Sequence, residues 1–459
     1  MFQNFDFIEQ IDRTERLKAL RLHIKMQNLD GYIIPRTDLY QNEFLEPADS
    51  RLEWISGFTG SAGLCIVMLE NAYIFVDGRY ELQIQTEVQT EIFQPILTAT
   101  QTIKQWLIHN CSGKKIGYDP WLHTVSGISD LVSQVSVPPQ LIQCKNLIDS
   151  IWLSRPRRKP LFIEKHPIRF SGISTEYKRK KLSESLKSNG IDALIITKPE
   201  SICWLLNIRG RDVPHTPLVQ SLAIMYHDSR VDLFLRETHI SQNILKFLGP
   251  NLKIYDETSF LEITKKLINK KIQIDPTTLP IAIYRELKNN SQEIIKAVDP
   301  CILPKSIKNT IEIKGSKAAH ILDGSAFANF LHWFDTFKDK SNLDEIQIVK
   351  KLEKFRHATG FLKEISFDSI CGSGAHGAIV HYRVNFKTNR KILPTDLLLI
   401  DSGGQYKNGT TDITRTIAVG KPTELMIDCF TRVLKGLIAI SELQWPEGLA
   451  GKDIDSLAR

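Results

Sequence analysis

The stretch 397–416 constrains this chain most, because it places two carboxylates in a segment that otherwise favours β-structure. Four apolar residues lead into Asp401, and two glycines follow it. Asn408-Gly409 is a strong turn signal, and the residues after it are rich in β-forming side chains. The pattern predicts a β-hairpin that carries Asp401 on its first strand and Asp412 on its second.

Two acids in one hairpin are costly unless something neutralises them. A carboxylate at the end of a buried strand needs a partner, and two carboxylates on adjacent strands repel each other. Oxygen-rich sites suit Mg, Ca or Mn, and paired carboxylates can bridge two metal ions. A hairpin whose acids are held by backbone groups or arginines is the alternative. The pattern leaves both interpretations open.

The spacing of the two acids raises a geometric difficulty. A two-residue turn at Asn408-Gly409 places Asp412 opposite Gln405. The partner position of Asp412 is then about 13 Å along the strand from Asp401, at about 3.3 Å per residue. A shared metal site therefore requires either a bulge at the two glycines, which bends the strand, or a turn wider than two residues.

Composition places the chain among ordinary globular proteins. Its 459 residues are enough for about three domains of roughly 150 residues each. Hydrophobic residues make up 42% and charged residues 24%, and no apolar run approaches the ~18 residues that a membrane span needs. The first residues lack a secretory pattern, and the seven cysteines are scattered. We therefore expect reduced thiols, a cytoplasmic location and no membrane association.

The net charge of +7 raises the question of nucleic-acid binding. Two short basic clusters, 155–159 and 178–181, carry part of that charge. Neither is interleaved with the aromatic residues on which nucleic-acid bases stack. We predict that both clusters are solvated faces of a linker and a helix, and that nucleic acid is not a partner.

Hydrophobic periodicity and the positions of prolines predict an α/β protein of three domains. Residues 1–153 alternate helical and strand segments and predict an α/β domain. Prolines and a basic run predict a linker over 154–172. Residues 173–305 weakly repeat the first domain, which indicates an internal duplication. Residues 306–459 begin with two predicted helices and contain the hairpin.

Several runs of sequence resemble the aminopeptidase P family, Xaa-Pro aminopeptidases with a pita-bread catalytic fold. Residues 401–416 are similar to the metal-binding hairpin of that family. Residues 56–63 and 76–80 resemble the N-terminal domain of aminopeptidase P and its creatinase relatives. Residues 207–217 resemble a run in the three-domain members. The resemblance implies an α/β (α+β) protein: two creatinase-like domains followed by the first half of a pita-bread domain.

The resemblance also implies roles for particular residues. The two metal-binding aspartates of the family correspond to Asp401 and Asp412. The run 377–382 is similar to a family segment whose histidine lies beside the metals and helps to bind substrate or move protons. That role corresponds to His381, where a neutral imidazole can donate to a carbonyl oxygen as charge develops on it. Two Mn²⁺ ions are the implied cofactor.

Two other histidines are less informative. The family usually has Pro-Asn where this chain has Ala375-His376, so His376 receives no role. His215 lies in the proline-punctuated run 207–217. It is either a loop histidine without a role or a residue at the rim of the active cleft.

The activity implied by the resemblance is metal-dependent hydrolysis that releases the residue before proline. The substrates would be peptides with proline at the second position, and the enzyme would be a homodimer. Two alternatives are a prolidase- or creatinase-type hydrolase and a non-catalytic binding protein with the same fold. The second domain and the run 207–217 argue against the first alternative, and retention of Asp401, Asp412 and His381 argues against the second.

The family's metal site uses three further ligands, a histidine and two glutamates, in runs beyond the hairpin. Those runs do not occur in residues 1–459. We therefore expect a C-terminally truncated chain that binds metal weakly and lacks peptidase activity alone. Half of a pita-bread sheet exposes an edge and an apolar face, so we also expect this chain to aggregate.

Overall fold

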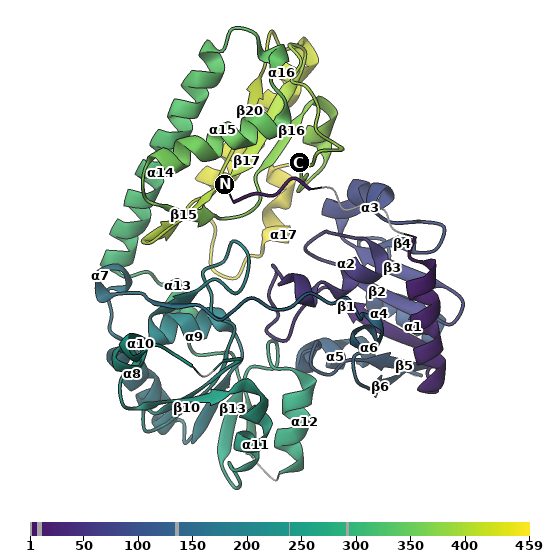
Figure 1. Cartoon of the computed structure of the whole chain (residues 1–459), viewed down its shortest axis with the longest axis vertical. Helices are drawn as coiled ribbons and strands as arrows, with labels where there is room; N and C mark the ends of the chain where they lie inside the picture. The colour runs from purple at the N-terminus through teal and green to yellow at the C-terminus, as the bar shows by residue number, and fades with distance from the viewer. Residues whose placement is uncertain (1, 7–11, 134–136, 238, 291–292) are drawn as a thin grey trace.

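The structure, a computed structural model, describes residues 2–6, 12–133, 137–237, 239–290 and 293–459. Figure 1 shows three bodies that follow one another along the chain: a purple-to-blue first domain, a teal second domain and a green-to-yellow third domain. The first and second domains lie side by side, and the third lies against both.

The first domain is a mixed sheet covered by helices, with strand order β4-β3-β2-β1-β5-β6. The central strand β1 pairs antiparallel with β2 and parallel with β5. Its apolar residues are buried because helices cover both faces of the sheet. The strands are β1 Gly31–Pro35, β2 Leu64–Met68, β3 Ala72–Val76, β4 Gln94–Leu97, β5 Lys115–Tyr118 and β6 Gln140–Gln143. The helices are α1 Thr14–Met26, α2 Arg51–Ser56, α3 Glu81–Glu87, α4 Ile103–Cys111, α5 Val125–Val132 and α6 Leu147–Ile151.

The second domain repeats this topology, with strand order β12-β11-β10-β8-β13-β14. Each pairing has the same direction as its counterpart in the first domain, as an internal duplication predicts. The strands are β8 Ala193–Ile196, β10 Leu222–Tyr226, β11 Val231–Leu235, β12 Leu252–Asp256, β13 Lys271–Ile274 and β14 Glu293–Lys296. The helices are α8 Thr175–Ser188, α9 Pro199–Leu206, α10 Gln242–Leu248, α11 Phe260–Lys265 and α12 Ile281–Asn289.

The two N-terminal domains share one hydrophobic core. A single cluster of buried side chains includes Phe75 of the first sheet and Phe234 of the second. The backbone N–H of Ile281 donates to the carbonyl of His123 across the junction at 2.9 Å. The two sheets are therefore joined by buried apolar surface as well as by the chain.

The predicted linker is partly built into the second domain. It contains β7 Ile163–Lys165, which pairs antiparallel with β9 Ile208–Gly210, and α7 Ile168–Ser171.

The third domain packs two helices against two small sheets. Its long helix α14, Thr310–Thr336, begins at Asn309, whose side chain caps the free N–H groups of the first turn. Phe327, Phe330 and Phe334 recur on one side of α14 and are buried in the domain core with α15, Glu345–Ala358. The sheets have the orders β15-β18-β19 and β16-β17-β20. The strands are β15 Leu362–Ile365, β16 Ile370–Ser373, β17 Leu397–Ser402, β18 Gly404–Tyr406, β19 Gly409–Thr410 and β20 Ile413–Ala418, and the other helices are α16 Glu424–Glu442 and α17 Gly451–Ile454. The short helix α13, Ile302–Ser306, lies before α14 and packs on α9 of the second domain.

The first residues of the chain are seated in this third domain (Figure 1). Phe5 is buried in its core, and the backbone N–H of Phe386 donates to the Phe5 carbonyl at 3.0 Å. The Gln3 side chain accepts from Ser369 N–H at 2.8 Å and donates to the Ser369 carbonyl at 3.2 Å. Residues 2–6 and the C-terminal segment therefore belong to the same domain.

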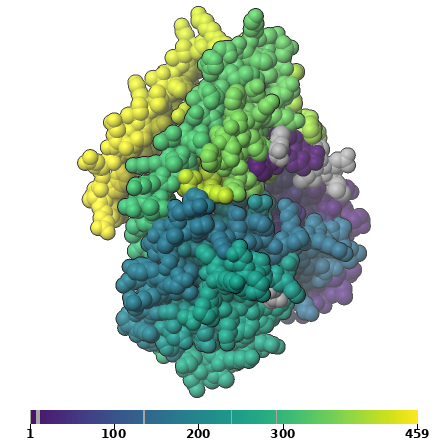
Figure 2. Space-filling view, turned by 60° about the vertical axis from the view of Figure 1, so that its left-hand side comes forward, coloured from purple at the N-terminus to yellow at the C-terminus, as the bar shows by residue number. Residues whose placement is uncertain are grey.

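Helix α16 lies on the outside of the molecule, along the yellow flank in Figure 2. Within this helix, all of which is described, only Gly436 is buried. Leu425, Phe430 and Val433 are exposed apolar residues on it. None of the helices in the described residues combines the length and the apolar character that crossing a bilayer requires.

Candidate active site

The hairpin that carries the two aspartates turns one residue earlier than the sequence predicts. Tyr406 pairs with Gly409, so the two-residue loop is Lys407-Asn408 instead of Asn408-Gly409. The register is unbroken on both sides of this loop, and it places Asp412 opposite Gly403. Both predicted ways of joining the acids, a bulge at the glycines and a wider turn, are therefore wrong.

The shifted turn places the two acids on one face of the hairpin. Asp401 is paired with Thr414, two residues from Asp412. Side chains two residues apart on a strand point the same way, so Asp401 and Asp412 are diagonal neighbours. Such neighbours are about 7 Å apart at the Cα atoms, within reach of a common cation.

Gly403 is the point at which the hairpin passes from one sheet to the other. β17 belongs to the sheet with β16 and β20, and β18 belongs to the sheet with β15 and β19. A Cβ atom at Gly403 would lie 2.0 Å from the Thr411 carbonyl oxygen and 2.2 Å from Ser366 Oγ. Because both sheets approach the strand here, glycine is the residue that fits.

The electrostatic surroundings of Asp401 are those of a candidate metal ligand. Burial raises the pKa of its carboxyl group and the negative charge of Asp412 raises it further, while the Thr414 side chain and His381 act in the opposite direction. The buried Asp401 Oδ1 has no hydrogen-bond partner among the described residues. A buried, unpartnered carboxylate oxygen beside a second carboxylate is suited to a hard divalent cation, so Asp401 and Asp412 fit a metal.

The structure gathers few other ligands at this point. In the residues it describes, no group of three or more His, Cys, Asp or Glu side chains is arranged to hold a metal ion. Asp401 and Asp412 are thus the oxygen donors that this part of the chain offers.

His381 lies close enough to Asp401 to act against the rise in the pKa of that carboxyl group. The histidine ring also contacts the first domain. Its Nδ1 is 3.0 Å from the hydroxyl oxygen of Tyr80. The sequence pattern 76–80 contains Tyr80 but gives no reason to assign it a role. The contact joins residues 301 positions apart, so only the packed domains bring it about.

His215 joins the second domain to the hairpin region. Its ring nitrogens lie 3.4 Å from carboxylate oxygens of Glu364 and Asp368. Its carbonyl accepts from the Gln405 side chain at 2.8 Å. Burial raises the pKa of Glu364, but hydrogen bonds from His215 outweigh it and the pKa is lowered. His215 also lines a cavity of about 420 Å³ with Asp368 and Arg383, at the junction of the three domains.

His376 belongs to a buried network instead. Its Nδ1 is 2.9 Å from the buried Glu345 carboxylate, which also accepts from the Ser373 N–H and the Tyr382 hydroxyl. Glu345 is at the start of α15, so this network attaches that helix to the loop before His381.

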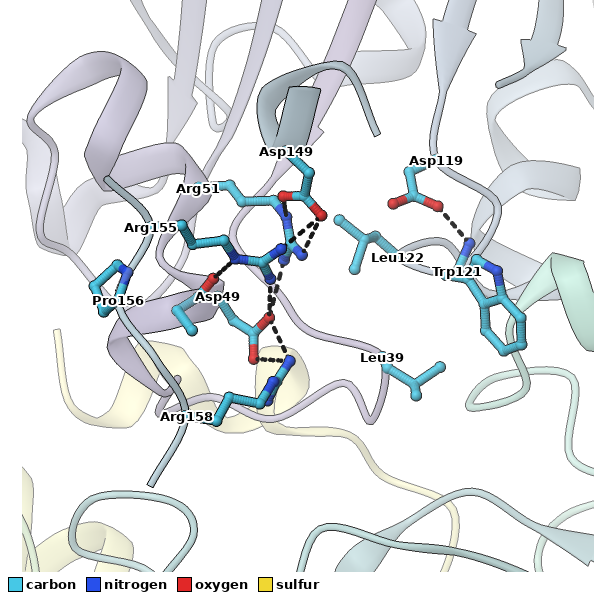
Figure 3. A pocket seen from close by; sticks show the side chains of 11 residues that line it. Leu39, Asp49, Arg51, Asp119, Trp121, Leu122, Asp149, Arg155, Pro156 and Arg158 are labelled. Atoms are coloured by element: carbon cyan, nitrogen blue, oxygen red, sulfur yellow. Dashed lines mark hydrogen bonds and ion pairs between the residues drawn. The ribbon is translucent and has the colours of Figure 1, made fainter. Parts of the chain in front are cut away.

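The prediction that both basic clusters are solvated holds only in part: Arg157 and Lys159 of the first cluster are exposed, whereas other cations of that cluster form ion pairs with buried carboxylates. Asp49 is 2% exposed and pairs with Arg51, Arg155 and Arg158 at 3.1, 3.3 and 2.8 Å. Figure 3 shows these arginines directed at Asp49 and Asp149 beside a cavity of about 510 Å³. Because a buried carboxylate needs cations, this part of the linker binds the first domain.

In the second cluster Lys180 and Lys181 are exposed as predicted, and the other two cations are not. Lys178 and Arg179 are 5% and 4% exposed. Lys178 donates to the Trp204 carbonyl and the Asn207 side chain at 2.8 and 2.7 Å, and burial lowers its pKa to about 8. These two cations hold α8 against the rest of the second domain.

Known domain families match the three domains in order. The creatinase/prolidase N-terminal domain matches residues 16–151, and a second form of it matches residues 154–312. Metallopeptidase family M24 matches residues 314–459, the part that contains Asp401 and Asp412.

Whole-chain relatives decide the family. The Xaa-Pro aminopeptidase 1 of Dictyostelium discoideum is 34% identical over 97% of this chain and 73% of its own length. This chain belongs to the Xaa-Pro aminopeptidase family. A protein of Paracoccidioides brasiliensis named "Probable Xaa-Pro aminopeptidase P" is 33% identical over 98% of this chain and 76% of its own length. The family consists of metallo-exopeptidases, which confirms the predicted function and enzyme class.

A solved Xaa-Pro aminopeptidase has the same arrangement of domains. The X-prolyl aminopeptidase of Caenorhabditis elegans matches with a TM-score of 0.90 and 27% identity. The match covers 98% of this chain and 77% of that protein, which is described as a cytosolic enzyme with a di-nuclear active site. The predicted fold, two creatinase-like domains and a pita-bread domain, is therefore confirmed.

Proposed function

We propose that this protein is a manganese-dependent Xaa-Pro aminopeptidase in which Asp401 and Asp412 bind the metal and His381 contacts the substrate. The observation that carries the proposal is the pair of carboxylates on one face of the hairpin, where the buried Asp401 Oδ1 has no hydrogen-bond partner in the described part of the chain. Manganese suits such oxygen ligands. The di-nuclear site of the C. elegans relative supports a metal pair.

The bound metal would supply Lewis-acid polarisation of the carbonyl before proline. The residues of this chain do the rest by holding and orienting. Asp401 is kept in place by β20, where the Thr414 side chain lowers its pKa by hydrogen bonding. His381 is positioned beside the acids, where its ring can hold or exchange a proton with the substrate.

We also propose that the protein is a cytoplasmic homodimer that acts on peptides with proline at the second position. The cytosolic C. elegans relative supports the location, and all seven cysteines are free, as in a reducing compartment. Light scattering on the purified native protein tests the dimer, and a monomeric mass would contradict it.

The proposal is tested on the native protein, purified as its cells make it, with an intact mass recorded first. The substrates are a tripeptide Xaa-Pro-Yaa, its Xaa-Ala-Yaa counterpart and the dipeptide Xaa-Pro. We expect release of the first residue from Xaa-Pro-Yaa alone. A chelator should abolish this activity, and Mn²⁺ should restore it.

Two results would contradict the proposal. Turnover restricted to the dipeptide would indicate a prolidase-type enzyme. No turnover by a protein that retains its metal would indicate a binding protein.

A further inference from the structure

Tyr80 and His381 form a contact between the first domain and the proposed active site. The Tyr80 side chain is 1% exposed, and its hydroxyl oxygen lies 3.0 Å from His381 Nδ1. The two rings meet edge to face, with centroids 5.6 Å apart. Tyr80 is itself fixed by Phe58, which packs edge to face against it, and by Arg79, whose guanidinium lies 5.1 Å from the centre of its ring.

We propose that Tyr80 is a positioning residue. Its hydroxyl oxygen accepts a hydrogen bond from the Nδ1–H of His381 and so leaves Nε2 as the atom that accepts a hydrogen bond or a proton during the reaction. The inference rests on the proposed role of His381 in peptide hydrolysis. It adds to that role a residue of a different domain and a defined tautomer of the imidazole.

The direction of the hydrogen bonds around Tyr80 fixes the tautomer. The Ser61 hydroxyl is 2.9 Å from a carboxylate oxygen of Glu43, which can only accept, so Ser61 donates its single hydroxyl hydrogen there. Ser61 Oγ is also 2.8 Å from the Tyr80 hydroxyl, so Tyr80 must donate to Ser61. With its own hydrogen used, the Tyr80 oxygen accepts from Ser61 N–H at 3.1 Å and from His381 Nδ1–H.

The backbone of His381 is itself in an unfavourable conformation. His381 has φ of +60°, in the left-handed region that costs free energy for a residue with a side chain. The chain is held on its other side, because Tyr382 donates to Glu345 at 3.1 Å and Arg383 forms an ion pair with Asp368. Tyr80 is thus the contact that sets the ring, while the following residues set the backbone.

The tautomer changes what His381 can do. A neutral imidazole with its proton on Nδ1 has a lone pair on Nε2 and accepts there. The sequence suggests a neutral His381 that donates to the developing oxyanion, and this tautomer does not allow it. Donation from Nε2 requires the imidazolium form, in which Tyr80 still accepts from Nδ1–H.

The tautomer is measured directly by NMR. In this chain labelled with ¹⁵N in the histidine rings, Nδ1 of neutral His381 should be protonated and Nε2 unprotonated. Tyr80→Phe should shift the population toward Nε2–H. The matched control is Tyr32→Phe, another buried tyrosine of the first domain, whose hydroxyl accepts from Leu147 N–H. An Nε2–H tautomer in the parent protein, or no change in Tyr80→Phe, would overturn the inference.

Kinetics on the native enzyme separate this inference from the proposed function. We expect Tyr80→Phe to lower kcat about tenfold, the effect of one hydrogen bond, with KM and metal content unchanged. Tyr32→Phe should retain the parent kcat. Full activity in His381→Ala would refute the proposed role of His381. Loss of activity in His381→Ala, together with an unchanged kcat in Tyr80→Phe, would refute the positioning role alone.

Discussion

Asp412 lies opposite Gly403 in the hairpin, one diagonal step from Asp401 on the same face. The loop Lys407-Asn408 produces this register, and a turn one residue later would separate the acids. Repulsion between the two carboxylates therefore costs free energy, and the proposed metal ion would offset that cost.

Asp412→Asn should have opposite effects on stability and metal binding. Without metal, removing one like charge should raise the free energy of unfolding by about 0.5 kcal/mol. The pKa of Asp401 is raised by burial and by Asp412, so the cost of its ionised form is present above that pKa. The gain should therefore shrink as the pH falls and Asp401 is protonated.

Urea unfolding in chelator and Mn²⁺ titration by calorimetry measure the two effects. The control is Asp130→Asn, an exposed carboxylate on α5. Mn²⁺ affinity in Asp412→Asn equal to that of the parent would show that Asp412 is not a ligand.

Gly403→Ala should destabilise the third domain by about 2 kcal/mol, because its Cβ meets backbone and side-chain atoms that cannot both move. The nearest atoms would be 2.0 and 2.2 Å away. Gly324→Ala is the control, since a Cβ on this helical residue meets nothing within 4 Å. Denaturant unfolding should give Gly324→Ala a free energy of unfolding equal to or above that of the parent protein. Equal stability of both variants would contradict the close approach of the two sheets at Gly403.

The buried ion pair of Arg356 and Asp323 should contribute strongly to the stability of the third domain. Arg356 Nε is 2.7 Å from Asp323 Oδ1, and the side chains are 1% and 3% exposed. The Tyr406 hydroxyl donates to the same carboxylate at 2.8 Å and so ties the hairpin to α14. Arg356→Met leaves this carboxylate uncompensated and should cost about 3–5 kcal/mol.

Adding Asp323→Leu to Arg356→Met should recover much of that loss, because the unpaired charge is removed as well. Urea unfolding of the two single variants and the double variant gives the coupling energy. Additive losses would contradict a direct interaction.

His123 should make the junction of the first two domains sensitive to acid. Burial lowers its pKa from 6.5 to about 4, and its Nε2 has no partner among the described residues. The unfolded chain binds a proton near pH 6.5 and the folded chain does not. His123 therefore does not lower the free energy of unfolding above pH 6.5, and it lowers this free energy increasingly as the pH drops toward 4.

The free energy of unfolding of the parent falls between pH 7 and pH 5, and His123→Gln should make this fall smaller by about 2 kcal/mol. Thermal unfolding at both pH values measures it, with His332→Gln at an exposed position of α14 as the control. An unchanged pH dependence in His123→Gln would show that His123 is protonated in the folded protein.

Local patterns determined most of the elements. The predicted hairpin and the two predicted helices at the start of the third domain occur, because alternation and helical periodicity decide which face of an element is buried. The repeated domain was visible because two related segments keep the same order of helix and strand. The aspartates stood out as acids in a segment that otherwise favours β-structure.

The turn register was predicted wrongly, and the basic clusters partly so, for one physical reason. Asn408-Gly409 is a good turn by itself, but β15 and α14 pack against the hairpin and select the neighbouring loop. Arg155 and Lys178 are charged residues in polar surroundings along the sequence. Buried carboxylates and carbonyls from elsewhere in the chain bring them into contact.

The sequence by itself determined the order of helices and strands, the duplication, the family and the two candidate metal ligands, since these depend on near neighbours along the chain. Only the tertiary structure decided that Asp401 and Asp412 share a face and that Tyr80 meets His381. Such contacts depend on how sheets and domains pack, because a shift of one residue in register or a few ångströms between domains removes them while leaving every local pattern unchanged.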